Sequence, residues 1–175
     1  GDLNHAYTMC KEGKKQSPID ISTTKKTKLS KINFSYSAEP KEILNNGHTV
    51  QVNMKKGSTI MVDGKKYNLL QFHFHAPSEH TINGKPADMV AHFVHQAKDG
   101  QLGVVGVLFK IGSKESSENP ALTKLWKYMP EHAGDKKAIA PGLVVAKLLP
   151  GKTNYYHYSG SLTTPPCSEN VNWMV

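Results

Sequence analysis

Short apolar runs separated by turn dipeptides make up most of residues 32–111. The runs are rich in Val, Ile, Phe, Tyr and Thr, which favour strands, and the dipeptides are Asn-Gly or Asp-Gly pairs, which favour tight hairpin turns. These pairs are Asn46-Gly47, Asp63-Gly64, Asn83-Gly84 and Asp99-Gly100. The pattern predicts a series of antiparallel strands.

Three of the turn pairs fix the order of the predicted strands. The strands are Thr59–Val62, Tyr67–His75, His80–Ile82, Met89–Gln96 and Leu102–Ile111. Asp63-Gly64 separates the first two strands, Asn83-Gly84 separates the next two, and Asp99-Gly100 leads into the last strand. We therefore expect antiparallel strands, with a hairpin across each of the first two of these turns.

One helix is predicted after the strands. Asn119 is a suitable N-cap and Pro120 suits the first turn of a helix. An apolar stripe follows at helical spacing, formed by Leu122, Leu125, Trp126 and Met129. Such a stripe is more often core than a cofactor site, so we expect this helix to cover the sheet.

Length and composition predict one domain with no membrane span. The chain has 175 residues and a formal net charge of +8, which by itself permits an anionic partner such as nucleic acid. However, every basic residue is Lys, so the guanidinium fork that reads guanine or clamps phosphate is missing. The Lys doublets are dispersed, which favours a solvated surface and no nucleic-acid partner. With no signal-peptide pattern at Gly1, we expect a mature product or a trimmed chain.

Two cysteines lie near opposite ends of the chain. Cys10 and Cys167 suit one long-range disulfide in an oxidising compartment, and they equally suit two reduced thiols in the cytosol. Their positions alone leave both states open.

A metal site is predicted where histidines alternate with phenylalanines. The two-residue period of a strand places Gln71, His73 and His75 on one face. Same-face neighbours lie about 6.5–7 Å apart at the backbone, so the two imidazoles can converge on one ion at about 2.0–2.1 Å each. A third ligand must come from another segment.

The third ligand has two equal candidates by spacing. His92 and His95 are three residues apart and therefore point to opposite faces of a strand, so only one can join the pair. His80, near a turn, is a further candidate. Ligation by histidine alone, without cysteine, is typical of a catalytic zinc with an open fourth position.

Five segments together resemble the α-class carbonic anhydrases, in their bacterial secreted or periplasmic form. They are Gln16-Ser17-Pro18-Ile19-Asp20-Ile21, Phe72-His73-Phe74-His75, Ser78-Glu79-His80-Thr81, His92-Phe93-Val94-His95 and Ser161-Leu162-Thr163-Thr164-Pro165-Pro166. The resemblance implies one mainly β domain over residues 1–175, with a large, mostly antiparallel twisted central sheet and a few short surface helices. It also implies a zinc enzyme that hydrates carbon dioxide to bicarbonate and a proton, through attack by zinc-bound hydroxide.

The resemblance also implies roles for individual residues. It selects His92 as the third zinc ligand and makes Thr163 the acceptor of a hydrogen bond from the zinc-bound hydroxide, with Glu79 accepting the proton of Thr163. Thr164 would help to hold bicarbonate. The expected apolar wall for carbon dioxide consists of Val94, Val104, Leu162 and Val171.

Further expectations concern the cleft and the cysteines. The resemblance makes His48 the shuttle that carries protons to solvent through water, supported by Asn46 and Gln51. Gln71 is expected in the same cleft, as a hydrogen-bond partner for a ligand imidazole. The resemblance also pairs Cys10 with Cys167 as a disulfide, and this bond implies a periplasmic or secreted protein.

The chain departs from the family in two respects. Val90 stands where the family usually has a glutamate that accepts the second N–H of the third ligand. The absence of such a partner predicts zinc retention weaker by about 10–100-fold, unless water or another residue substitutes. The chain also lacks the family's first aromatic segment before Cys10 and stops at Val175, so we expect it to be truncated at both ends, with unpaired sheet edges near the zinc site.

Two alternative functions compete with carbon dioxide hydration. One is a non-catalytic carbonic-anhydrase-like binding domain, which the presence of all three histidines argues against. The other is a zinc hydrolase that cleaves esters with the same nucleophile. The resemblance further implies inhibition by sulfonamides and anions, and it allows a homodimer.

Overall fold

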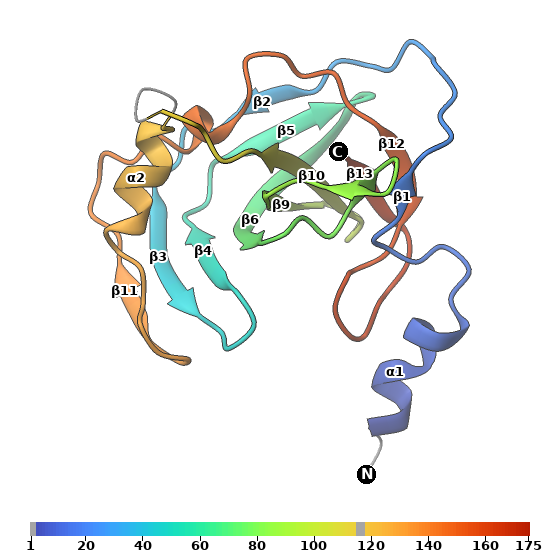
Figure 1. Ribbon diagram of the computed structural model, residues 1–175, viewed down its shortest axis with the longest axis horizontal. Helices are drawn as coiled ribbons and strands as arrows, with labels where there is room; N and C mark the ends of the chain where they lie inside the picture. The colour runs from blue at the N-terminus through green and yellow to red at the C-terminus, as the bar shows by residue number, and fades with distance from the viewer. Residues whose placement is uncertain (1–2, 115–117) are drawn as a thin grey trace.

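A ten-stranded β-sheet runs through the part of the chain that this computed structural model describes, residues 3–114 and 118–175 (Figure 1). Its strands, in spatial order, are β11 (Lys136–Ala138), β3 (Pro40–Asn45), β4 (Val50–Met54), β6 (Lys65–His75), β9 (Met89–Ala97), β10 (Leu102–Phe109), β13 (Val171–Met174) and β12 (His157–Gly160). Off this path, β5 (Thr59–Val62) pairs with β2 (Asn33–Ser35) and β6. Of the described pairs in this sheet, only β10 with β13 is parallel, which confirms the mostly antiparallel architecture.

The remaining described elements are short. A small sheet contains β1 (Asp20–Ile21), β7 (Thr81–Ile82) and β8 (Lys85–Pro86), and the helical elements are α1 (Leu3–Glu12), α2 (Pro120–Trp126) and the 3-10 turn η2 (Val145–Leu148). The sequence analysis predicted no element before Cys10, so α1 is an addition. It lies away from the sheet (Figure 1).

The predicted hairpins form with one exception. Asp63 and Gly64 both have positive φ, 49° and 70°, and join β5 to β6 as expected of an Asp-Gly turn. Asn83 and Gly84 also have positive φ, but their turn joins β7 to β8. The expectation that it would join its strand directly to β9 is wrong, because two residues after the turn already pair back across it.

A β-bulge in β6 decides which side chains face the core. The pairing of β6 with β9 shifts between Leu69 and Gln71. Before the bulge the odd-numbered residues Tyr67 and Leu69 are buried in the main core, whereas after it the even-numbered Phe72 and Phe74 are buried there. The extra residue of a bulge causes this change of phase. It turns Gln71, His73 and His75 to the opposite face.

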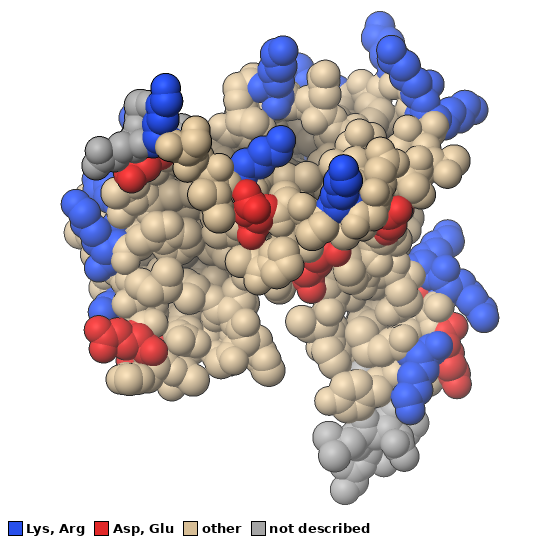
Figure 2. All heavy atoms as spheres, viewed as in Figure 1, with Lys and Arg blue, Asp and Glu red and all other residues tan. Residues whose placement is uncertain are grey.

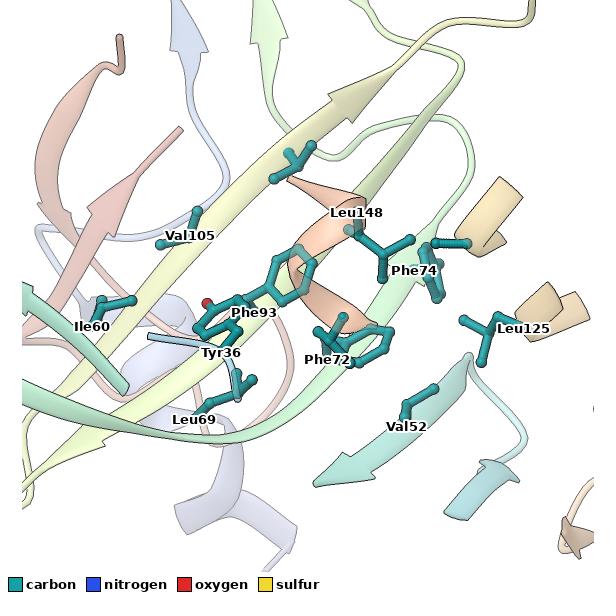
Figure 3. Close-up of a cluster of buried hydrophobic side chains, with 14 of the residues drawn as sticks. Tyr36, Val52, Ile60, Leu69, Phe72, Phe74, Phe93, Val105, Leu125 and Leu148 are labelled. Atoms are coloured by element: carbon teal, nitrogen blue, oxygen red, sulfur yellow. The ribbon is translucent and has the colours of Figure 1, made fainter. Parts of the chain in front are cut away.

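The main core lies on the phenylalanine face of the sheet, and Figure 3 shows Phe72, Phe74 and Phe93 within it. Helix α2 covers this face: Leu125 is fully buried, and the rings of Phe74 and Trp126 lie 4.9 Å apart. The side chain of Asn119 caps the helix by accepting from two backbone N–H groups, as predicted. Met129 lies beyond the helix end and is 36% exposed, so its assignment to the apolar stripe is wrong.

Residues 10–17, which precede β1, are bonded to the loop that follows β12. Cys10 and Cys167 form a disulfide, which confirms the pairing implied by the resemblance. Gln16 Nε2 donates to the carbonyl of Cys167 at 3.1 Å. The backbone N–H of Ser17 donates to Ser161 Oγ at 2.8 Å. These contacts hold residues 161–167, which include the predicted threonines, against the body of the protein.

Candidate metal centre

Strands β6 and β9 bring three imidazoles together. His73 lies directly opposite His92 in the strand register, and His75 is two residues along on the same face of β6. The ring centroids are 5.1 Å apart for His73 and His75, 5.3 Å for His73 and His92, and 4.9 Å for His75 and His92. One nitrogen from each ring lies within 4.8 Å of the others. At this spacing, small side-chain rotations can bring the three nitrogens into contact with one ion.

Hydrogen bonding orients the first imidazole. His73 Nδ1 lies 2.9 Å from Gln71 Oε1, so the amide oxygen accepts the Nδ1–H proton and leaves the lone pair of Nε2 available. Gln71 therefore contacts a ring of the cluster, as expected from its position on the same face.

Glu79 approaches the other two rings. Its Oε1 lies 3.2 Å from His75 Nε2 and 3.8 Å from His92 Nδ1. The distance to His75 Nε2 is short enough for a hydrogen bond, but the two groups are not aligned for one. Neither His75 Nε2 nor Glu79 Oε1 therefore has a hydrogen-bond partner. His75 Nε2 is therefore a buried nitrogen with unused bonding capacity, and a metal ion would supply its missing partner.

Burial favours the uncharged form of two imidazoles in the cluster, those of His73 and His92. Burial, followed by the neighbouring His75 ring, lowers the pKa of His73 to about 4. Burial lowers the pKa of His92 well below its ordinary value, with smaller effects from His73, His75 and His80. Neutral imidazole is the form that binds a metal, and an all-imidazole set suits zinc with an open position. These residues therefore fit a zinc ion.

His95 is excluded from the cluster by the face on which it lies. Its side chain is fully buried in the main core, where Nε2 lies 2.5 Å from Tyr36 Oη and Nδ1 lies 3.0 Å from the Gly103 carbonyl oxygen. The carbonyl can only accept, so Nδ1 carries the proton and Tyr36 donates to Nε2. The tertiary structure thus brings His92, and not His95, to the pair.

His80 is buried beside the cluster without joining it. Its Nε2 lies 2.5 Å from Tyr158 Oη, which in turn lies 2.7 Å from Ser17 Oγ. Burial lowers the pKa of His80 to about 4. The ring is therefore neutral and hydrogen-bonded on one side.

Val90 occupies the position at which the family usually has a glutamate. It is fully buried, lies opposite His75 in the register and shares a face with His92. Two ring nitrogens in this region, His92 Nε2 and His80 Nδ1, are buried without a hydrogen-bond partner. The structure therefore contains an unsatisfied donor on the imidazole that a family acid would have supported.

The residues predicted for the apolar wall lie together. Val94, Val104 and Val171 are buried in one small cluster that is separate from the main core, and Leu162 packs against it. Trp173 belongs to the same cluster, and its ring lies 5.0 Å from that of His92. Trp173 was not among the residues predicted for the wall, although its position two residues after Val171 on a strand places both on one face.

Thr163 and Thr164 lie on the loop after β12. Thr163 is half-buried and Thr164 is exposed. The loop is closed by a hydrogen bond from the N–H of Cys167 to the carbonyl of Thr164, at 2.9 Å. Among the hydrogen bonds of the described residues, none joins Thr163 to Glu79, so that contact stays a prediction.

His48 lies on the exposed turn between β3 and β4. Asn46 Oδ1 accepts hydrogen bonds from the backbone N–H groups of His48 and Thr49, at 2.9 and 2.8 Å, and so shapes the turn. Gln51 lies opposite His73 in the register of β4 and β6 and donates through Nε2 to Asn53 Oδ1 at 2.8 Å. Figure 2 shows a notch at the lower edge of the molecule, between the β3–β4 turn and the loop after β12.

Comparison with known proteins gives a consistent result. The family model for eukaryotic-type carbonic anhydrase matches residues 3–175. Carbonic anhydrases of Klebsiella pneumoniae and Pectobacterium atrosepticum are 45% and 39% identical to the chain, which aligns over its whole length and covers 70% of each.

Solved structures agree with these relatives. The α-carbonic anhydrase of Photobacterium profundum superposes with a TM-score of 0.90 at 43% identity, covering 97% of this chain and 76% of that one. The α-carbonic anhydrase of Thermovibrio ammonificans, in complex with the inhibitor sulfanilamide, gives 0.86 at 48% identity, covering 97% and 74%. The chain therefore belongs to the α-carbonic anhydrase family, the enzymes that interconvert carbon dioxide and bicarbonate. Members of this family depend on zinc in general.

Proposed function

We propose that this protein hydrates carbon dioxide with a zinc ion held by His73, His75 and His92. The observation that carries the proposal is the convergence of three imidazoles, with one nitrogen from each within 4.8 Å of the others. Bound zinc supplies a Lewis acid that makes a hydroxide nucleophile available near neutral pH. The non-catalytic alternative has no supporting observation, because the three histidines are present and suitably placed.

The surrounding residues would orient the reactants. We assign Thr163 the task of accepting a hydrogen bond from the nucleophile while its own hydroxyl proton goes to Glu79, so that a lone pair points at carbon dioxide. Carbon dioxide is apolar, and the cluster of Val94, Val104, Val171 and Leu162 offers it an apolar surface. Thr164 would hydrogen-bond the bicarbonate product.

Proton release would use His48. Its exposed position on the β3–β4 turn gives its imidazole contact with solvent, so that its ring nitrogens can exchange protons with water. Asn46, which holds the turn, and Gln51, which lies beside His73, would support the water chain.

We also propose that the protein works in the periplasm or outside the cell. The disulfide between Cys10 and Cys167 supports this, because such bonds persist mainly in oxidising compartments. None of the helices in the described residues is long and apolar enough to span a membrane. Lysines are scattered over the face seen in Figure 2, which is consistent with a solvated surface. Association into a homodimer stays a prediction that analytical sedimentation would test.

One experiment tests the function directly. Stopped-flow carbon dioxide hydration, zinc content and sulfonamide inhibition are measured on the same sample. We expect about one zinc per chain, rapid hydration and loss of activity with a sulfonamide. Stoichiometric zinc without hydration would contradict the proposal, and an ester hydrolysis rate far above the hydration rate would favour the hydrolase alternative.

A further inference from the structure

Two unpartnered nitrogens on neighbouring buried rings remain unexplained by the proposed function. They are His92 Nε2 and His80 Nδ1, on side chains that are each 1% exposed. The two ring centroids are 6.1 Å apart, and both rings pack against Trp173, at 5.0 and 4.7 Å. Buried polar atoms rarely lack a hydrogen-bond partner, so two of them in one place point to a shared partner between them.

The protonation states of the two nitrogens are complementary. When His92 binds a metal through Nδ1, which lies 3.8 Å from Glu79 Oε1, its Nε2 carries a proton and is a donor. His80 can be the acceptor if its own proton is on Nε2. That proton then goes to Tyr158 Oη, at 2.5 Å.

The hydrogen bonds beyond Tyr158 are consistent with this direction. With its oxygen accepting from His80, Tyr158 donates its hydroxyl proton to Ser17 Oγ at 2.7 Å. Ser17 Oγ also accepts from the backbone N–H of Ser161 at 3.0 Å, which uses both of its lone pairs. The opposite tautomer of His80 would instead leave two N–H donors in the same buried region without an acceptor.

His92 lies beside a residue of β10 that has no side chain. Its neighbour across the β9–β10 ladder is Gly106, which carries no side chain. The atoms nearest to a Cβ placed on Gly106 would belong to Val175 and Val90, at the ordinary contact distances of 3.7 and 3.8 Å. A buried water needs at least two polar partners, and the two free nitrogens are such partners.

We propose that His80 is the positioning residue for His92, with its Nδ1 accepting the Nε2–H proton of His92 through one buried water. His80 thereby substitutes for the carboxylate that Val90 does not provide. This inference rests on the zinc site proposed above. It extends the site into a relay from His92 through His80 and Tyr158 to Ser17, which fixes the ligand ring to the segment that also holds the loop of Thr163.

The first test measures zinc release into excess chelator. His80→Phe removes the acceptor and should speed zinc loss by about 10–100-fold. His95→Phe is the matched control, because it removes another buried histidine from the opposite face, and it should change the rate less than about threefold. In His80→Phe, adding Val90→Glu should restore most of the loss, because the carboxylate accepts from His92 directly. Equal rates for wild type and His80→Phe, or equal acceleration by His95→Phe, would overturn the proposal.

The second test reads the tautomer and needs no variant. Long-range proton–nitrogen NMR of wild type should show His80 protonated on Nε2, both with and without zinc. Protonation on Nδ1 would refute the inference. Because the metal-free protein also gives this reading, the inference can be judged separately from the proposed function, which fails if wild type binds no zinc.

Discussion

Replacing Val90 with glutamate should make zinc leave the protein more slowly. Val90 is fully buried and lies on the face of β9 that carries His92, two residues away. A carboxylate there can accept the otherwise unpartnered Nε2–H of His92. Because the metal fixes that proton on Nε2, the new hydrogen bond favours the zinc-bound form over the metal-free form.

The size of the effect follows from the unsatisfied atom. An unpartnered buried donor costs about 1–3 kcal/mol, and about 1.4 kcal/mol corresponds to a tenfold change in an equilibrium constant. Loss of a supporting partner for a metal-ligating histidine typically costs about 10–100-fold in affinity. A water held by His80 would already recover part of this free energy, so we expect Val90→Glu to slow zinc release by about tenfold. Gly106 lies close to residue 90 and has no side chain, since a Cβ on it would lie 3.8 Å from Val90 Cγ2.

The assay is zinc release into excess chelator, followed with a metal-sensitive dye. Val90→Leu is the control, because it is apolar and adds volume without an acceptor, and it should leave the rate unchanged. The metal-free form of Val90→Glu should unfold at lower urea concentration than wild type, since it buries a carboxylate without its partner. Equal release rates for wild type and Val90→Glu would refute the reasoning, and so would an equal slowing by Val90→Leu.

Three further predictions concern the metal, the pH dependence of stability and the disulfide. His92→Ala should lose bound zinc and reduce carbon dioxide hydration by more than about 100-fold, and unchanged hydration would revive the non-catalytic reading. His95 is neutral when folded, with burial lowering its pKa to about 4, so it contributes stability above the unfolded pKa near 6.5 that is lost as the pH falls through 4. The loss in the free energy of unfolding is about 3 kcal/mol. Urea unfolding at a series of pH values between 4 and 6.5 should show that wild type takes up about one more proton on unfolding than His95→Gln does. Identical pH dependences of the two proteins would contradict the assignment. Cys10→Ser should lower the free energy of unfolding by about 5 kcal/mol in the chain-entropy model, because the disulfide joins residues 157 positions apart, and a urea midpoint equal to that of wild type would count against it.

The first half of the metal site could be predicted from local sequence. Gln71, His73 and His75 share a face because strand side chains alternate with a period of two, and this holds wherever the strand lies in the fold. The Asp63-Gly64 hairpin and the Asn119 cap are equally local, since each depends on residues only a few positions apart. For the same reason the mainly β class and the order of the strands could be anticipated.

The turn at Asn83-Gly84 shows how far local signals reach. The dipeptide correctly predicted a tight turn, but which strands it joins depends on pairing with β1, more than 60 positions earlier in the chain. Similarly, α1 is joined by the disulfide to Cys167 at the other end of the chain. Neither arrangement follows from the residues that form it.

The third histidine was decided by tertiary structure. Spacing left His92 and His95 equal, and only the family resemblance distinguished them. In the fold, the bulge after Leu69 changes the phase of β6, so that His73 meets His92 across the ladder while Leu69 meets His95 on the core side. The sequence by itself determined which residues share a strand face. Only the packing of the strands determined which faces meet, because the register between segments depends on the whole sheet.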